Sequence, residues 1–579
     1  MSTVQRETFT VKLRPALRPQ EPPAEPKTTE LPVGHKKRPG CRAFTTPTIF
    51  ESDQVLILRD GTKLRADIFR PKTDEKVPGI IMWGPYGKTN SGMLTLDAMP
   101  FRAGVPESSQ SGYESFEGLD PAEWVPRGYS IINIDARGAG HSEGDILWWG
   151  SSDGRDGHDA IEELAKLPWS NGKLGMSGNS WLAVAQYFIA AEQPPHLAAI
   201  APLEGAADMF REDSFRGGIP SVVFASWIAG ILPGRNQQED WPAMIESTST
   251  TNDYFEDRRV DFSKIKVPAY IGGSYSTDLH TLGSLRAFEE IPHQDKWLVV
   301  HSTQEWYDLY SSSRTADLDK YFSRYLKDAN NDWETTPRVR LSLLNYTSPA
   351  IDNIPFPDLP WHLPSAQCTT IYLAPNLTLS PTAPSDRSTL AYQADGSETL
   401  SFTHTFASRT ALVGPSTLTV YISSPDHDDL DIYAHIFKYS ASGLELSNLN
   451  IPVSSDVSVE EARAGTQNRV FRYWGPSGQI RASQRHVCPT RSTKTWSTLS
   501  HEEVQKVVPG EVVRLDVQLW PTGIIFAPGE KLVLTISGEK IGIPTLPNLL
   551  KGQNQNRGKH TLHLGRDQES SFKFFTVDI

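Results

Sequence analysis

Residues that could form a serine-based catalytic triad occur along the chain in the order Ser180, Asp278 and His301. Ser180 lies within residues 173–188, a segment that predicts a strand end, a sharp turn and the start of a helix. A serine hydroxyl is a good nucleophile when an imidazole takes its proton and a carboxylate orients that imidazole. The sequence therefore predicts Ser180 as nucleophile, His301 as base and Asp278 as acid.

The turn at Ser180 departs from the G-x-S-x-G pattern, in which small residues on both sides of the serine permit a tight bend. Gly178 supplies the first small residue, whereas Leu182 occupies the place of the second. Residues 153–172 predict a helix and a turn before the strand, and residues 197–202 predict a further buried strand. Strands that alternate with helices indicate a parallel sheet covered on both faces.

Four segments in chain order carry a family resemblance. They are Pro-Tyr-Gly-Lys at 85–88, Asp-Ala-Arg-Gly-Ala-Gly-His-Ser-Glu-Gly at 135–144, Pro-Trp-Ser-Asn-Gly at 168–172, and the turn at Ser180. Together they resemble the cocaine-esterase and X-Pro dipeptidyl-peptidase superfamily of serine α/β-hydrolases, over roughly residues 45–579. The resemblance implies an α/β fold: an α/β-hydrolase domain with a helical cap insertion, followed by a C-terminal jelly-roll β-sandwich.

The resemblance also implies roles for individual residues. Tyr86 would donate its hydroxyl to the oxyanion, together with the backbone N–H of Trp181, the residue after the nucleophile. The alternative for Tyr86 is a structural tyrosine at a strand end. Asp278 matches the family's acid position, because it ends the predicted strand 267–278 and precedes a helix.

The base is placed less regularly than the acid. His301 ends the predicted strand 296–301, but a gapless alignment with the family's commoner Gly-Pro-Trp-x-His arrangement puts Glu305 where the histidine should stand. His280 is the rival base. It follows Asp278 by two residues, so we expect it to be too close to that acid to reach Ser180 with good geometry.

Changes in composition and periodicity predict five regions. They are a Pro-rich N-terminal arm or tail (1–48), the first part of the α/β-hydrolase domain (49–204), the helical cap (205–260), the second part of the hydrolase domain (261–336) and the jelly-roll (337–579). For residues 1–48 we favour a disordered tail, unless the segment packs on a partner subunit of a homodimer.

Aromatic residues predict an apolar substrate pocket near Ser180. The cap contains many of them, some of which must form its own core, and those left facing the cleft would bind an acyl chain or a ring. The candidate substrate-binding residues are Trp148, Trp149, Phe215, Trp227 and Trp306.

Composition excludes several other functions. A formal charge of -13 without a long basic run argues against nucleic acid or an anionic membrane as the main partner. Three scattered cysteines do not make a disulfide framework or a metal site, and the aspartates of 426–431 lack the glycine and distant glutamate of a calcium loop. The glycines near 138–140 lack the third glycine of a dinucleotide-binding loop. We therefore expect no cofactor and no metal, and a cytoplasmic location, because the N-terminus lacks the apolar core of a signal peptide.

The sequence thus predicts a serine hydrolase that cleaves a carboxylic ester or lactone of a small to medium apolar metabolite through an acyl-enzyme. Two alternatives stay open. One is acyl transfer or amide cleavage on the same fold. The other is non-hydrolytic binding or rearrangement in a degenerate cleft, which the irregular turn and the displaced histidine keep in view.

Overall fold

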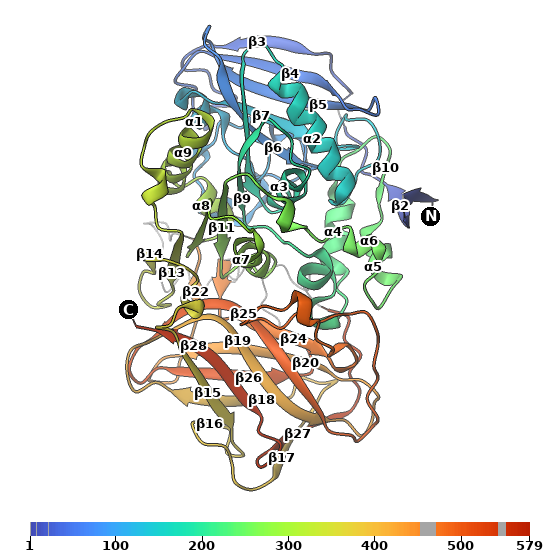
Figure 1. Cartoon of the computed structure of the whole chain (residues 1–579), viewed down its shortest axis with the longest axis vertical. Helices are drawn as coiled ribbons and strands as arrows, with labels where there is room; N and C mark the ends of the chain where they lie inside the picture. Colours follow the sequence, from blue (N-terminus) through green and yellow to red (C-terminus); the bar gives the residue numbers. More distant parts are fainter. Residues whose placement is uncertain (1, 7, 21, 452–470, 542–551, 579) are drawn as a thin grey trace.

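The chain divides into a mixed α/β part and an all-β part, which lie one above the other in Figure 1. The structure is a computed structural model, and it describes all residues except 1, 7, 21, 452–470, 542–551 and 579. No helix among the described residues is long and apolar enough to cross a membrane.

The α/β part is built on one sheet of eleven strands. Its order is β14-β13-β12-β11-β9-β8-β6-β7-β5-β4-β3, and the strands from β7 to β13 in this order are parallel. Every residue of β6, β7 and β11 is buried, as expected for parallel strands covered on both faces. The strands are β3 (Lys27–Leu31), β4 (Thr48–Ile57), β5 (Lys63–Pro71), β6 (Val77–Gly84), β7 (Ser130–Asp135), β8 (Ser170–Asn179), β9 (Leu197–Leu203), β11 (Ala269–Ser274), β12 (Lys296–His301), β13 (Val339–Leu343) and β14 (Ile351–Phe356).

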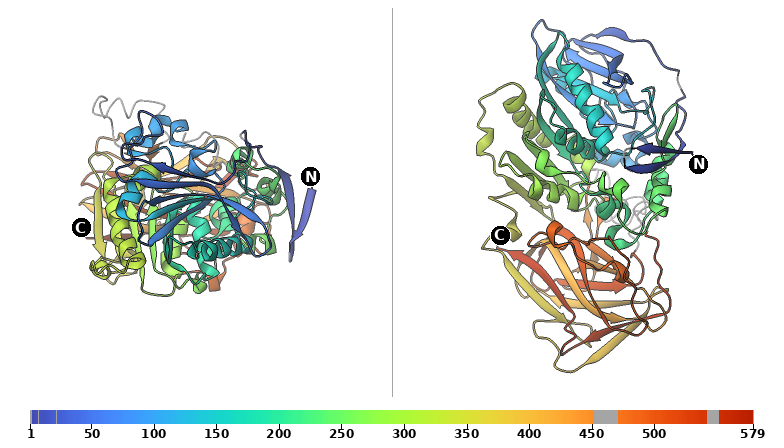
Figure 2. Two further views of the ribbon diagram at one scale, coloured as in Figure 1. Left: turned by 90° about the horizontal axis from the view of Figure 1, so that it is seen from above. Right: turned by 45° about the vertical axis from the view of Figure 1, so that its right-hand side comes forward.

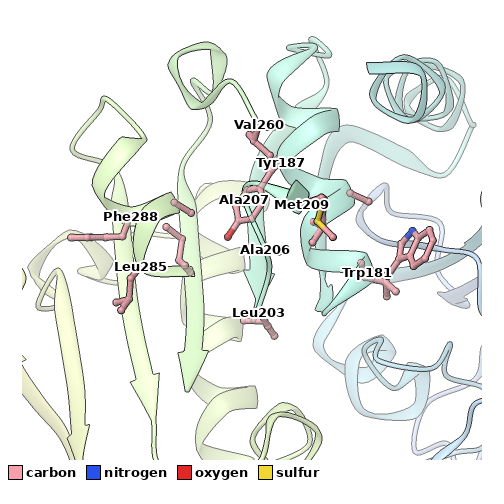
Figure 3. Close-up of a cluster of buried hydrophobic side chains, with 14 of the residues drawn as sticks. Trp181, Tyr187, Leu203, Ala206, Ala207, Met209, Val260, Leu285 and Phe288 are labelled. Atoms are coloured by element: carbon pink, nitrogen blue, oxygen red, sulfur yellow. The ribbon is translucent and has the colours of Figure 1, made fainter. Parts of the chain in front are cut away.

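Helices cover the two faces of this sheet. A Cβ atom on Gly175 would meet Phe322 of α9 (Ser312–Leu326), whereas one on Gly178 would meet Leu182 of α3 (Trp181–Ala191). Residues 175 and 178 of β8 are an odd number of positions apart, so these helices pack on opposite faces. The remaining helices of this part outside the cap are α1 (Pro121–Trp124), α2 (Ser151–Ala165), α7 (Thr281–Glu290) and α8 (Glu305–Leu309). Figure 3 shows buried side chains of α3 and α7 together with Leu203, the last residue of β9.

The predicted cap lies between β9 and β11. It contains a π-helical turn (Met209–Ser214), a 3-10 turn (Arg216–Gly218), α4 (Val223–Ile231), β10 (Gln237–Glu239), α5 (Trp241–Glu246) and α6 (Asp253–Glu256). Its aromatic core includes Phe210 and Phe215, whose rings stack with centroids 4.2 Å apart. The cap therefore buries part of its aromatic content within itself.

The N-terminal segment is folded, which corrects the preference for a disordered tail. The strand β2 (Phe9–Pro15) pairs with β1 (Ser2–Arg6) on one side and with β10 of the cap on the other. The strand β3 extends the edge of the large sheet by pairing with β4. Figure 2 shows the N-terminal strands beside the hydrolase domain of the same chain. Prolines lower helix formation but permit such edge strands, so composition alone did not distinguish an arm from a tail.

The all-β part has antiparallel pairing throughout its described strands. Its main path runs β16-β15-β28-β19-β25-β24-β20-β26-β18, with β17, β21 and β27 paired beside it, and forms a β-sandwich. The longest strands are β19 (Thr410–Ser423) and β25 (Val513–Phe526). The others are β15 (Gln367–Leu373), β16 (Leu379–Ser380), β17 (Ser388–Gln393), β18 (Thr399–Thr405), β20 (Asp431–Tyr439), β21 (Glu445–Leu446), β24 (Ser477–Arg481), β26 (Lys531–Ser537), β27 (Lys559–Leu564) and β28 (Ser571–Val577); β22 (Asn448–Leu449) and β23 (Arg472–Tyr473) pair separately.

The predicted domain boundary at residue 337 needs a correction. Residues 339–343 form β13, which pairs in parallel with β12 of the large sheet, and β14 follows it as the edge strand. The alternating pattern that begins near residue 337 predicts a strand, and the sequence places it in the sandwich. Alternation identifies a strand but does not say which sheet the strand joins.

Candidate active site

Ser180 stands between the end of β8 and the start of α3 with a strained backbone. Its φ of 55° and ψ of -118° lie where non-glycine residues are rare, which is typical of a nucleophile turn. Its N–H donates to the carbonyl oxygens of Leu203 and Glu204 at 3.2 and 3.0 Å. The conformation predicted from the sequence is therefore present, and the neighbouring strand β9 helps to hold it.

Leu182 explains how the turn tolerates a large residue at its second small position. Its side chain is fully buried and lies against two glycines: a Cβ atom on Gly178 would lie 2.6 Å from Leu182 Cδ2, and one on Gly84 would lie 2.7 Å from Leu182 Cδ1. Because Gly84 of β6 and Gly178 of β8 have no side chains, there is room for the leucine. The departure from G-x-S-x-G is compensated by packing.

A pocket opens at Ser180. Its wall is mostly apolar, and it draws on the hydrolase domain and on the cap. Figure 3 shows that Trp181, Met209 and Ala206 lie near one another. The lining residues are Tyr86, Trp148, Trp149, Ser180, Trp181, Val184, Ala206, Met209, Asp213, Phe224, Ala225, Ile228, Leu279 and His280.

The structure places the five candidate substrate-binding residues in different environments. Trp148 and Trp149 line the pocket, and the Trp149 ring lies 4.0 Å from that of Trp181 between centroids. Phe215 stacks on Phe210 inside the cap, and Trp227 is 36% exposed. The indole N–H of Trp306 donates to Glu117 Oε1 at 3.1 Å. The last three are not among the residues that line this pocket. The prediction was wrong for them because composition does not determine in which direction a side chain points.

Tyr86 and Trp181, the predicted oxyanion-hole residues, lie beside Ser180 in the pocket wall. Both line the pocket with Ser180, and their rings pack edge to face at 6.0 Å between centroids. Burial and the charges of Glu117 and Glu305 raise the pKa of Tyr86 well above its usual value, although a hydrogen bond with Ser180 lowers it. The Tyr86 hydroxyl therefore stays protonated and can donate a hydrogen bond. Trp181 is the first residue of α3, where backbone N–H groups lack partners within the helix.

Asp278 does not contact His301, so the predicted pairing of acid and base in the triad is wrong. Asp278 Oδ1 accepts from Arg216 Nη1 at 2.8 Å and Oδ2 accepts from Lys540 Nζ at 2.6 Å. Burial would raise the pKa of this carboxyl, but the charges of Arg216 and Lys540 hold it below its usual value. Asp278 thus joins the cap to the sandwich, and both of its oxygens are occupied by cations.

His301 is held away from the pocket by other groups. Its Nε2 lies 2.8 Å from Glu204 Oε1 and 3.8 Å from Asp308 Oδ2, and its Nδ1 lies 3.4 Å from Thr303 Oγ1. Burial opposes its protonation, but Asp308 and Glu204 raise the pKa of His301 above its ordinary value. The residue that we predicted as base therefore contacts carboxylates and is not among the residues that line the pocket.

His280 lies in the pocket wall together with Ser180. Its Nδ1 is 3.3 Å from Glu305 Oε2 and 3.9 Å from Glu204 Oε2. Burial lowers the pKa of His280, but Glu305, Glu204 and Asp213 raise it above its ordinary value. Sequence reasoning named His280 only as a rival and missed Glu204. The signal for Glu305 was its alignment with the position of the family's histidine.

His280, Glu204 and Glu305 are also the described residues that could hold a metal ion. Each brings one ligand atom within 4.8 Å of the other two. Glu305 and the neighbouring Glu117 have raised pKa values, first because of burial. The arrangement can therefore bind a proton or a cation close to the nucleophile.

Two family models match separate parts of the chain. Residues 60–239 match the model described as X-Pro dipeptidyl-peptidase (S15 family), and residues 331–572 match the model of the X-Pro dipeptidyl-peptidase C-terminal non-catalytic domain. The first segment corresponds to the first part of the hydrolase domain with most of the cap, and the second to the β-sandwich with the last strands of the large sheet; β11 and β12 lie between the two matches.

Individual proteins are similar over different lengths. The cocaine esterase of a Rhodococcus species is 29% identical over 210 residues, which cover 35% of this chain and only 33% of the esterase. A putative serine esterase of Mycobacterium tuberculosis is 21% identical over an alignment of 588 positions, gaps included, which covers 83% of this chain and 89% of that protein.

Solved structures extend the similarity to nearly the whole chain. A CocE/NonD family hydrolase from Staphylococcus aureus is 29% identical, with a TM-score of 0.84 and coverage of 96% of this chain and 97% of that one. An α-amino acid ester hydrolase is 15% identical with a TM-score of 0.67, covering 91% of this chain and 96% of that one. The second similarity shows the fold alone.

Proposed function

The chain belongs to the cocaine-esterase and X-Pro dipeptidyl-peptidase superfamily of serine α/β-hydrolases, and from this we propose that it cleaves a carboxylic ester or lactone of a small to medium apolar metabolite. The observation that carries the proposal is the strained Ser180 in the wall of an aromatic pocket. The coarser activity, that of a hydrolase of this serine peptidase and esterase family, follows from the family itself.

The reaction follows from the groups around the serine. Ser180 Oγ attacks the carbonyl carbon, and the negative charge that develops on the carbonyl oxygen is stabilised by the Tyr86 hydroxyl and the Trp181 N–H. The alcohol leaves, and water then releases the acid from the acyl-enzyme. Trp148, Trp149 and Trp181 line the pocket with Ser180. Moving an apolar acyl or alcohol group of the substrate from water into this pocket therefore lowers the free energy of binding.

Two observations favour an ester over a peptide substrate. The pocket wall contains one carboxylate, Asp213, which already accepts a hydrogen bond from Ser214 Oγ at 3.1 Å, so a peptide's free amino group would meet few acidic partners. A relative that aligns with most of the chain is described as a putative serine esterase. Acyl transfer shares the same acyl-enzyme, and it differs only in the acceptor.

A panel of p-nitrophenyl esters, aryl lactones and X-Pro anilides tests the proposal, with Ser180→Ala beside the wild type. We expect turnover of apolar esters that Ser180→Ala lowers by about 10⁴-fold or more. Mass analysis of the products should show addition of water. Products that carry an added alcohol would instead indicate transfer, and products of unchanged mass would indicate rearrangement. Turnover that Ser180→Ala retains would overturn the proposal.

A further inference from the structure

We propose that His280 and Glu305 form the base and acid that serve Ser180, with the histidine and the carboxylate in exchanged positions relative to the family arrangement. In the family, the acid follows the strand equivalent to β11 and the histidine follows the strand equivalent to β12. Here the histidine follows β11 and the carboxylate follows β12. This inference rests on the proposed nucleophilic role of Ser180.

The sheet makes such an exchange geometrically simple. β11 and β12 are adjacent parallel strands, with Ser274 opposite His301 at their carboxyl ends. The segments that follow them therefore emerge side by side at the same edge of the sheet, where ligand sites of such sheets form. A histidine and an acid that trade segments can still meet each other beside Ser180.

The contacts of His280 fit a catalytic base. Its Nδ1 lies within ion-pair distance of Glu305 Oε2, at 3.3 Å, and His280 lines the same pocket as Ser180, so Nε2 is the nitrogen left for the serine. A carboxylate at Nδ1 favours the tautomer with the proton on that nitrogen, so that Nε2 can accept. The backbone N–H of His280 donates to the carbonyl oxygen of Thr277, and His280 is the N-cap residue of α7. These contacts fix the backbone from which the imidazole extends.

Glu305 is a positioning residue with a fixed backbone. It is the first residue of α8, and the side chain of the preceding residue, Gln304, accepts hydrogen bonds from the N–H groups of Trp306 and Tyr307 at 2.7 and 3.3 Å. This cap determines where the helix starts and hence where the Glu305 carboxylate lies. The Glu305 side chain is 8% exposed, so water competes little for its carboxylate.

The other acid and the other histidine are already engaged. Asp278 holds Arg216 and Lys540, and His301 lies against Glu204 and Thr303. Neither lines the pocket at Ser180. One exchange therefore accounts for both irregularities of the sequence, the glutamate at the histidine's aligned position and the histidine two residues beyond the aligned acid.

The proton moves in balance with the covalent chemistry. As Ser180 Oγ forms its bond to the carbonyl carbon, its proton passes to His280 Nε2 and the carbonyl π electrons move to the oxygen. When the carbon–oxygen bond to the alcohol breaks, the alkoxide takes that proton from Nε2. Water repeats the sequence and returns Ser180 to its protonated form. Glu305 stabilises the imidazolium in both halves.

The rate at which a fluorophosphonate labels Ser180 tests the proposal in the full chain. We expect His280→Asn to lower the rate about 1,000-fold or more, and His301→Asn to lower it less. His196→Asn is the matched control, because His196 forms a similar pair with Glu162, at 2.8 Å, on the surface. Thermal unfolding confirms that each variant is folded.

A pH profile separates positioning from structural loss. Glu305→Gln removes a negative charge beside the imidazole, so the pH midpoint of labelling should fall, and the rate should drop about 1,000-fold. Glu305→Asp restores the charge and should return the midpoint towards the wild type. An unshifted midpoint in Glu305→Gln, or wild-type labelling of His280→Asn, would overturn the proposal.

Two further results are decisive. If Ser180 of the folded wild type does not react at all, the proposed function fails, and the His280–Glu305 pair fails with it. If Ser180 reacts but chelation with EDTA abolishes labelling and Zn²⁺ restores it, His280 is a metal ligand, and only the exchange is overturned. Labelling that persists after chelation supports the exchange.

Discussion

Asp278 and Lys540 form an ion pair between the hydrolase domain and the β-sandwich, with Oδ2 and Nζ 2.6 Å apart although the residues are separated by 262 positions in the sequence. Arg216 of the cap binds the other carboxylate oxygen and lies over the Trp520 ring, with 3.7 Å between the guanidinium carbon and the ring centroid. One carboxylate therefore connects three parts of the molecule.

Asp278→Asn is expected to destabilise the fold, because it leaves two buried cations without their counter-ion. Breaking such a pair costs of the order of 3 kcal/mol in the free energy of unfolding. The pKa of Asp278 is lowered in the folded state, so this contribution is present above the unfolded pKa of about 4 and is lost as pH falls further. Urea unfolding should therefore show a large difference from wild type at pH 7 and most of it still at pH 3.5, with the difference shrinking only at lower pH.

The segments around Ser180 could be predicted because their signals are local. Helical spacing, the turn at Ser170-Asn-Gly172 and the glycine at 178 lie within a few residues of one another, and β8 and α3 appear where expected. The predicted β-sandwich likewise appears, in the antiparallel strands from β15 to β28. Period and turn chemistry carry such information.

The partners of the charged residues could not be predicted in the same way. Asp278 is bound by Lys540, which comes from a domain that the local pattern around 278 does not reveal. Likewise, Glu204 meets His301 only because β9, β11 and β12 are neighbours in the sheet. The alternation at 339–343 was correct as a strand and wrong as a domain boundary for the same reason.

Tyr86→Phe tests the oxyanion hole separately from the base. The substitution keeps the ring packed against Phe116 and Trp181 but removes the hydroxyl. Loss of one oxyanion donor costs about 3 kcal/mol of barrier, so kcat on a p-nitrophenyl ester should fall about 100-fold with KM nearly unchanged. Wild-type kcat in the folded variant would remove Tyr86 from the oxyanion hole.

Leu182→Ala tests whether packing compensates for the missing glycine of the turn. The leucine is fully buried against Gly84 and Gly178, so truncation should lower the free energy of unfolding by about 2 to 5 kcal/mol. The same truncation of the exposed Leu444 should have little effect, because that side chain is 66% exposed. Equal stabilities of the two variants would show that Leu182 does not support the turn.

The effect of Asp153→Asn on the free energy of unfolding is expected to differ between low and high pH. Trp83 Nε1 donates to Asp153 Oδ1 at 2.9 Å, and Oδ2 is buried without a hydrogen-bond partner. Burial raises the pKa of this carboxyl to about 7. The folded protein therefore holds a proton that the unfolded chain releases near pH 4, and wild-type stability falls as pH rises from about 4 to about 7.

Asparagine cannot ionise, so the melting temperature of Asp153→Asn relative to wild type should rise between pH 5 and pH 8 and stay level above that. Asp159→Asn in the same helix provides the contrast. Although partial burial opposes ionisation there, the hydrogen bonds from Arg59 lower the pKa of Asp159, so its removal should cost stability at both pH values. Asp153 lies in the first turn of α2 and contacts the indole of Trp83 on β6. A rise confined to Asp153→Asn would therefore assign the pH dependence to this one buried carboxyl. Parallel curves for the two variants would mean that Asp153 is ionised in the folded protein.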